Sequence, residues 1–220
     1  MYRKIINFFK ICLYRLIDIV VTWQTIDWAT MYRKIQKGNV VVDVGGYFGG
    51  FAIFASKRVG SKGKVICFEP DNVNYRILEE RIRRQRIKNT LLIKKAISNR
   101  KDKVNLFSNF FYSSVCADYE KVKESAPIES IEIDTLDNQL DELGIKRIDF
   151  LKMNIEGAEI EAIEGAKNSL RNISYLVISS HKRNGDTVDV IEPILKGFGL
   201  QTKIKFGWRF GFHKKLYAWR

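Results

Sequence analysis

Apolar residues in the first 21 positions recur at the spacing of a helix. They include Ile5, Phe9, Cys12, Leu16 and Val20, three or four positions apart. This spacing predicts one amphipathic helix with a wide apolar face. Basic side chains are interspersed, so the predicted helix has three possible positions: packed on the following domain, over its ligand cleft, or on a membrane surface through residues 1–21.

Charged residues interrupt the same stretch. Lys10, Arg15 and Asp18 divide residues 5–21, whereas a membrane-spanning helix needs about 18 consecutive apolar residues. The two basic residues also lie where a cleavable leader would have its apolar region. We therefore expect neither a transmembrane segment nor a secretory leader.

From residue 38 onward, short apolar runs alternate with helical patterns. Runs typical of buried strands lie at 40–44, 64–69, 91–97, 148–153 and 175–180. Helical patterns follow at 51–59, 71–82, 157–170 and 188–197. The alternation predicts a mostly parallel, doubly wound α/β sheet with helices on both faces.

The remaining apolar segments do not alternate with helices. Residues 103–107 and 130–133 are predicted strands around a polar loop, and 201–206 and 213–219 form a predicted C-terminal antiparallel hairpin. The expected organisation is a basic helical extension over residues 1–37, followed by one domain over residues 38–220.

The charge is strongly basic and unevenly distributed. The 220 residues carry a net charge of +13. Residues 76–103 contain eleven Lys and Arg against three acids, and residues 196–220 contain seven and no acid. Such an excess favours anionic partners, namely nucleic acid, an acidic glycan or an anionic membrane surface. Solvated charged faces explain it equally well.

Few residues in the chain are suited to metal or disulfide chemistry. Cys12, Cys67 and Cys116 form no CxxC pair and cannot all pair as disulfides, which favours a reducing, cytoplasmic location. With only two histidines in the chain, we expect no metal site.

Asp43 and a glycine-rich turn follow the first predicted strand. The turn contains Gly45 and Gly49, a G-x-x-x-G spacing in which Tyr47 replaces the middle glycine of a dinucleotide fingerprint. A carboxylate ahead of the turn would repel a pyrophosphate and attract a cationic ligand, such as the sulfonium and ammonium of S-adenosylmethionine. Glu69 ends the second predicted strand, 20 residues beyond Gly49, where a carboxylate can accept hydrogen bonds from both hydroxyls of a ribose.

Five segments together resemble the motifs of the FkbM-family methyltransferases. They are VVDVGGYFGG (41–50), VICFEPD (65–71), KKAIS (94–98), EIDTLD (132–137) and FLKMNIEGAEIEAIEGA (150–166). The resemblance covers about residues 38–181. It implies a class I, Rossmann-like methyltransferase fold that uses S-adenosylmethionine and methylates a hydroxyl of a glycan, lipid-linked sugar or other small natural product.

The resemblance also implies a set of site residues. The cofactor-binding residues would be Asp43, Gly45, Gly46, Tyr47, Gly49, Glu69, Pro70 and Asn154, with Ala96 and Ile97 near the adenine. The chain departs from the family pattern at Asn154, where the family has aspartate, and at Ser179, where it commonly has glutamate.

Four residues are candidates for the chemistry of methyl transfer. The step needs an aligned acceptor oxygen and a group that takes its proton. Glu156 and His181 are the candidate bases, and Asn154 can hydrogen-bond but cannot take a proton. Lys152 is the fourth candidate, with a structural ion pair to Asp149 or Glu156 as its alternative. Glu156 could instead cap a helix, and His181 could be a structural histidine.

Two other functions remain open. A ribose 2′-O-methyltransferase acting on RNA would suit the charge of the chain. The chain contains neither an Asn-Pro-Pro-Tyr motif for amino methylation nor a Pro-Cys dipeptide for cytosine methylation. A binding-only protein that kept the fold but lost the chemistry is the third alternative.

Overall fold

The computed structural model describes residues 28–109, 112–114, 129–180, 187–206 and 214–220. The helix predicted within residues 1–21 lies outside these ranges, and so does His181. Within the described ranges, no helix combines the length and apolar character needed to cross a membrane.

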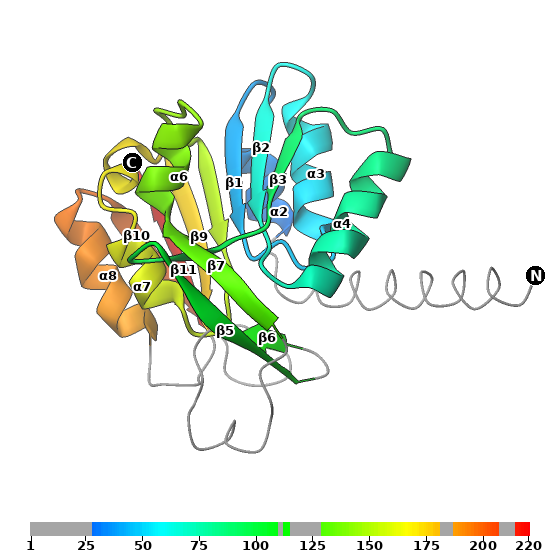
Figure 1. The fold of residues 1–220 in the computed structure, drawn as a ribbon. Helices are drawn as coiled ribbons and strands as arrows, with labels where there is room; N and C mark the ends of the chain where they lie inside the picture. The colour runs from blue at the N-terminus through cyan, green and yellow to red at the C-terminus, as the bar shows by residue number, and fades with distance from the viewer. Residues whose placement is uncertain (1–27, 110–111, 115–128, 181–186, 207–213) are drawn as a thin grey trace, which may run out of the picture.

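A seven-stranded, mostly parallel sheet forms the centre of the protein (Figure 1). Its order is β10-β11-β9-β8-β1-β2-β3, and β11 runs in the direction opposite to the other six strands. The strands are β1 (Val40–Val44), β2 (Lys64–Phe68), β3 (Thr90–Ile93), β8 (Phe150–Met153), β9 (Tyr175–Ser180), β10 (Gln201–Phe206) and β11 (Lys214–Trp219). This confirms the predicted α/β fold and its C-terminal hairpin.

Helices cover both faces of this sheet. In Figure 1, α3 and α4 lie on one side of the strands, and α6, α7 and α8 lie on the other. The helices are α2 (Trp28–Lys34), α3 (Gly50–Val59), α4 (Asn72–Arg84), α6 (Leu136–Glu142), α7 (Glu159–Glu164) and α8 (Thr187–Gly197). Met31 and Ile35, in and just after α2, pack into the apolar cluster of the α3 face. The end of the predicted N-terminal extension is thus part of the core.

The strand predicted over residues 91–97 is two strands in different sheets. After β3, the chain passes through Lys94 and Lys95 into β4 (Ala96–Ser98), which pairs with β7 (Glu129–Thr135). The second sheet has the order β4-β7-β5-β6, with β5 (Asp102–Asn109) and β6 (Tyr112–Ser114). Where the chain leaves the first sheet, Nζ of Lys95 lies 3.6 Å from Oδ2 of the buried Asp134 of β7.

The helix predicted over residues 157–170 is shorter and interrupted. It consists of α7, a turn, and a 3-10 helix over Ser169–Asn172. A Cβ on Gly165 would lie 2.0 Å from the carbonyl oxygen of Ser98, so the chain turns where it packs against β4. The Asp137 carboxylate then accepts the backbone N–H groups of Asn168 and Ser169.

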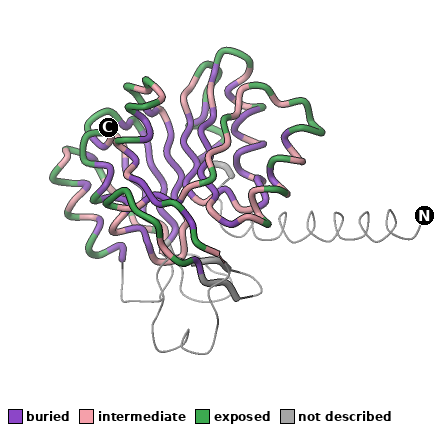
Figure 2. Tube along the Cα trace, in the orientation of Figure 1, coloured by how far each residue is buried: buried purple, intermediate pink, exposed green. Residues whose placement is uncertain are grey.

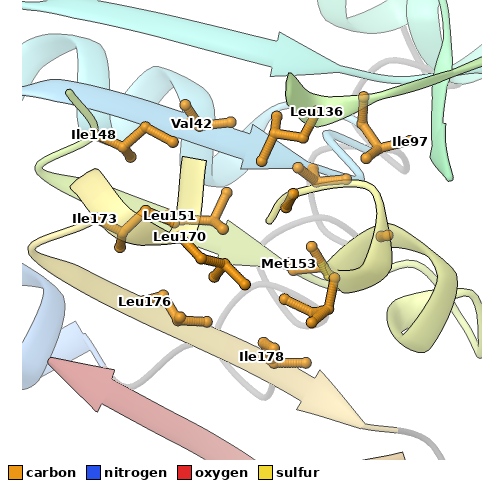
Figure 3. Close-up of a cluster of buried hydrophobic side chains, with 14 of the residues drawn as sticks. Val42, Ile97, Leu136, Ile148, Leu151, Met153, Leu170, Ile173, Leu176 and Ile178 are labelled. Atoms are coloured by element: carbon orange, nitrogen blue, oxygen red, sulfur yellow. The ribbon is translucent and has the colours of Figure 1, made fainter. Parts of the chain in front are cut away.

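Two apolar clusters, one on each face, hold the layers together. Figure 2 shows buried residues along the central strands and exposed residues on the outer helix surfaces. Figure 3 shows the larger cluster, in which Leu151, Met153 and Ile178 of the sheet lie in one apolar group with Leu136 and Leu170. Because each fully buried apolar side chain contributes about 1.5–3 kcal/mol, these clusters fix the strands whose carboxyl ends carry the candidate site.

Candidate functional site

The candidate site residues meet at the carboxyl edge of the seven-stranded sheet. β1 lies between β2 and β8, so the chain order reverses direction beside β1. Ligands of doubly wound sheets bind at such a switch point, beyond the carboxyl ends of the strands. Asp43, Glu69 and Asn154 come from the ends of these three strands.

A buried ion pair joins β1 to β8. Asp43 and Lys152 are cross-strand partners, and the Nζ of Lys152 lies 2.8 Å from Oδ1 of Asp43. The same Nζ donates to the carbonyl oxygen of Gly45 at 2.5 Å. Asp43 has no exposed surface. Lys152 is thus paired with Asp43, not with Asp149 or Glu156 as the sequence suggested, and it fixes the start of the glycine-rich turn.

Cys67 is a neighbour of this pair that the sequence did not single out. Its Sγ lies 3.6 Å from Oδ2 of Asp43, and its side chain is fully buried. Burial, and then the charge of Asp43, raise the pKa of the thiol well above its ordinary value. A neutral thiol therefore contacts Oδ2 of Asp43, while Lys152 contacts Oδ1. Nothing in the spacing of Cys67 indicates this contact.

The turn between β1 and α3 requires its glycines. Gly45 has a φ of 86°, and a Cβ there would lie 2.1 Å from the carbonyl oxygen of Asn154. Gly49 has a φ of 87°, and its Cβ would meet Leu78 at the same distance. Gly46 packs against Cys67, where a Cβ would lie 2.4 Å from the sulfur. At these three positions the turn leaves no room for a side chain.

Glu69 is a buried carboxylate that holds this turn. Its Oε2 accepts the backbone N–H of Tyr47 at 2.6 Å, and its Oε1 accepts that of Asp71 at 3.0 Å. Only 5% of Glu69 is exposed. Burial raises its pKa from 4.5 to about 7, although the two backbone hydrogen bonds act in the opposite direction. Tyr47 itself has a positive φ of 50°, a strained conformation for a residue with a side chain.

A second tight turn follows β8. The N–H of Asn154 donates to the carbonyl oxygen of Val44 at 3.0 Å, and Asn154 is half-buried. Glu156, also half-buried, has a φ of 55°. Such strain in a residue with a side chain is typical of functional sites.

Glu159 holds this second turn in place. Its Oε1 accepts the N–H groups of Ile155 and Gly157, both at 3.2 Å. Its side chain has no exposed surface, and burial raises its pKa. Within the described part of the chain, its Oε2 has no hydrogen-bond partner. Sequence reasoning did not assign Glu159 a role, although it ends the run Glu-Gly-Ala-Glu that begins at Glu156.

The remaining predicted residues lie around this group. Pro70 is half-buried between Glu69 and Asp71. Ala96 and Ile97 are buried in β4, and Ile97 packs into the larger apolar cluster. Their predicted position near an adenine stays a prediction. Ser179 is buried near the end of β9.

The chemistry of the donor set fits a nucleoside better than a metal. In the described ranges, no cluster of three or more His, Cys, Asp or Glu side chains could hold a metal ion. A carboxylate offers about four lone-pair positions, and Glu69 receives N–H donors from Tyr47, Asp71 and Asn74. It therefore keeps capacity for a ribose hydroxyl beside a turn that lacks side chains at Gly45 and Gly46.

Solved structures share this fold. A SAM-dependent methyltransferase from Aquifex aeolicus is similar over 94% of this chain and 97% of its own, with a TM-score of 0.55 and 16% identity. An rRNA methylase from Streptococcus thermophilus is similar over 87% of this chain and 92% of its own, with a TM-score of 0.56 and 13% identity. Aeropyrum pernix fibrillarin, in complex with S-adenosyl-L-methionine, is similar over 84% of this chain and 68% of its own, with a TM-score of 0.51 and 17% identity. At these identities the likeness shows the fold.

The family assignment comes from the sequence. No curated protein matches the chain at a significant level. The model described as the methyltransferase FkbM domain matches residues 43–201, well over half of the chain. The match begins at Asp43 and includes both tight turns, and together with the shared fold it supports the predicted cofactor, S-adenosylmethionine. The chain belongs to the FkbM methyltransferase family.

Proposed function

We propose that the protein transfers a methyl group from S-adenosylmethionine to a hydroxyl of a glycan, lipid-linked sugar or other small natural product. One observation carries this proposal: the FkbM-domain match over residues 43–201 spans every described candidate residue. The geometry agrees with it, because the match coincides with two strained turns and a buried carboxylate at the switch point of the sheet.

Glu69 and the first turn would hold the nucleoside of the cofactor. The carboxylate of Glu69 accepts the N–H of Tyr47, so it fixes the turn and would present its one remaining lone-pair position to a ribose hydroxyl. Because Glu69 is buried, each hydrogen bond to it is stronger than one in water. Lys152 acts as a positioning residue, since its Nζ donates to both Asp43 and Gly45.

The second turn would serve the acceptor. When bound, S-adenosylmethionine supplies a methyl group activated by its sulfonium. The residues of this chain must align the acceptor hydroxyl and take its proton. Asn154, half-buried after β8, can hydrogen-bond the hydroxyl but cannot take its proton. Glu156 is the candidate base within the described residues, and His181, which lies outside them, is the other.

Titration calorimetry with S-adenosylhomocysteine tests the cofactor. We expect micromolar binding by the parent and loss of most of it in Glu69→Gln, which removes the carboxylate. Glu79→Gln, an exposed position on α4, is the matched control and should bind as the parent does. A folded parent protein that does not bind would contradict the proposal and favour a binding-only role without this cofactor.

Transfer of a labelled methyl group to candidate acceptors tests the reaction. Neutral and anionic oligosaccharides and RNA should be assayed side by side with the same preparation. RNA is included because the chain carries a net charge of +13. Label in a sugar hydroxyl supports the proposal. Label in the 2′-hydroxyl of RNA ribose would instead establish the ribose methyltransferase alternative.

A further inference from the structure

The carboxylate of Glu69 and the start of α4 form one hydrogen-bonded segment. Oε1 of Glu69 accepts the N–H of Asp71 at 3.0 Å, and Nδ2 of Asn74 lies 3.4 Å from the same oxygen. Asp71 is the N-cap of α4, and its Oδ1 accepts the N–H groups of Val73 and Asn74 at 2.8 and 2.9 Å. The position of the Glu69 carboxylate therefore depends on how firmly residues 69–74 are held.

One N–H of this segment is accepted by a residue of the second sheet. The N–H of Asn72 donates to Oε1 of Glu129 at 2.6 Å, and Glu129 is the first residue of β7. The first N–H groups of a helix have no acceptor within the helix. Glu69 and Asp71 accept the other N–H groups of residues 71–74, so Glu129 supplies the acceptor that the segment does not supply itself.

Lys94 contacts the carboxylate of Glu129 in this position. Its Nζ lies 3.6 Å from Oε2 of Glu129 and 3.2 Å from Oδ1 of Asn72. The side chain of Glu129 is 23% exposed and that of Lys94 is 41% exposed. An ion pair this accessible to water contributes little, whereas a hydrogen bond from a backbone N–H to a carboxylate is among the stronger ones. The hydrogen bond between Asn72 and Glu129 is therefore the main connection.

The second sheet has an apolar core that does not include this contact. Ile131 and Ile133 of β7 are buried in a separate cluster with Ala96 of β4 and Leu106 of β5. Glu129 lies at the start of β7, two residues before Ile131. We therefore expect both sheets to stay folded without its carboxylate, while the N-terminus of α4 loses an acceptor.

We infer that Glu129 is a positioning residue of the cofactor site. It acts through the N–H of Asn72, which belongs to the segment that carries Glu69, and so the second sheet contributes to cofactor binding. The inference rests on the proposed function, because it takes Glu69 as the group that binds the ribose of S-adenosylmethionine. Glu129 lies 57 positions from Asn72 in the sequence, so only the folded structure brings the two together.

Titration calorimetry of the full chain with two ligands tests the inference. The ligands are S-adenosylhomocysteine and its 2′,3′-dideoxy analogue, which lacks the hydroxyls that Glu69 would bind. Glu129→Ala loses a hydrogen bond to a charged group, so it should bind S-adenosylhomocysteine about tenfold more weakly than the parent, and the analogue less than about threefold more weakly. Glu129→Gln keeps an oxygen acceptor and should stay within about threefold of the parent for both ligands.

Glu132→Ala is the matched control for the loss of a carboxylate. Glu132 is an exposed glutamate of the same strand, and its Oε2 also lies near a lysine, 3.8 Å from Nζ of Lys95. Its substitution leaves the contact with Asn72 in place. Glu132→Ala should therefore bind both ligands as the parent does.

Asn72→Pro tests the same contact from the donor side. Proline lacks the N–H and is favoured at the first position of a helix, which Asn72 occupies in α4. The preceding residue, Asp71, has a φ of −66° and a ψ of 127°, an extended conformation of the kind that a following proline favours. Asn72→Pro should weaken S-adenosylhomocysteine binding as Glu129→Ala does, and the double variant should bind no more weakly than either single variant.

The outcomes separate this inference from the proposed function. If the parent binds S-adenosylhomocysteine but the folded Glu129→Ala and Asn72→Pro variants bind it equally well, or lose affinity for both ligands alike, the inference is overturned. A loss in Glu132→Ala as large as that in Glu129→Ala overturns it as well. The proposed function stands in each of these cases. If the folded parent does not bind S-adenosylhomocysteine, the proposed function falls, and the inference falls with it.

Discussion

The carboxyl edge of the large sheet has two halves that differ in how far their charged side chains are buried. Over β1, β2 and β8, the charged groups are buried: Asp43, Glu69 and Lys152 are each less than a tenth exposed. Over β11 and β10, Lys215 and Lys205 become progressively more exposed. Buried charges interact strongly and hold one geometry, whereas exposed charges are screened by water and ions. The inner half therefore holds one geometry more firmly than the outer half does.

The largest effect should follow from breaking the buried ion pair. Lys152→Met would leave the Asp43 carboxylate buried without its cation, and we expect a loss of about 3–5 kcal/mol in the free energy of unfolding. Urea denaturation measures this loss. Lys146→Met, at an exposed lysine, is the control and should change stability by less than about 0.5 kcal/mol. Equal effects of the two substitutions would mean that burial does not distinguish them.

Glu69 should make stability depend on pH. Its folded-state pKa of about 7 exceeds its ordinary value of 4.5, so between these values the folded state binds more protons than the unfolded state, and stability falls as the pH rises. Across this pH range the group should lower the free energy of unfolding by about 3 kcal/mol. Relative to Glu69→Gln, the parent should therefore lose stability from pH 4.5 to 7. A difference between the two proteins that does not vary with pH would contradict the burial of the ionised group.

Gly45 tests the close approach of the two turns. Gly45→Ala would force an alanine to a φ of 86° and place its Cβ against the carbonyl oxygen of Asn154. We expect a loss of about 2–3 kcal/mol, together with loss of S-adenosylhomocysteine binding. Gly144 is the matched control, because its φ is 66° and no atom lies within 4 Å of its Cβ position. Gly144→Ala should cost only the backbone strain, about 1–2 kcal/mol.

The smallest effect on stability should come from the outer half. Lys215→Met removes a half-buried lysine near the surface, and we expect the free energy of unfolding to change by less than about 0.5 kcal/mol. Its binding of S-adenosylhomocysteine should match that of the parent. Thermal unfolding and calorimetry on one preparation measure both. A loss of stability as large as that of Lys152→Met would remove the distinction between the two halves.

Much of the inner half could be predicted from the sequence, because local chemistry determines it. Asp43, Gly45 and Glu69 lie at strand ends that apolar runs mark clearly, and parallel strands bring such ends to one edge. The partner of Lys152 could not be predicted in this way. It depends on the register of β1 against β8, which a single sequence does not reveal.

The second sheet and the alignment of β11 with β9 could not be predicted for a related reason. The run over residues 91–97 shows a continuous strand pattern, and only the pairing of β4 with β7 shows that the chain leaves the first sheet after Ile93. Similarly, the basic composition of residues 196–220 was evident, but the alignment of Lys215 with Ser179 appears only in the paired strands. Both features depend on contacts between residues distant in the sequence.

Titration of the full chain with S-adenosylhomocysteine tests the central claim most directly. The claim is that the buried inner half of the carboxyl edge, centred on Glu69, is a cofactor site. We predict micromolar binding by the parent and none by Gly45→Ala, with Gly144→Ala binding as the parent does. Absence of binding by a folded parent, or undiminished binding by a folded Gly45→Ala variant, would contradict the claim.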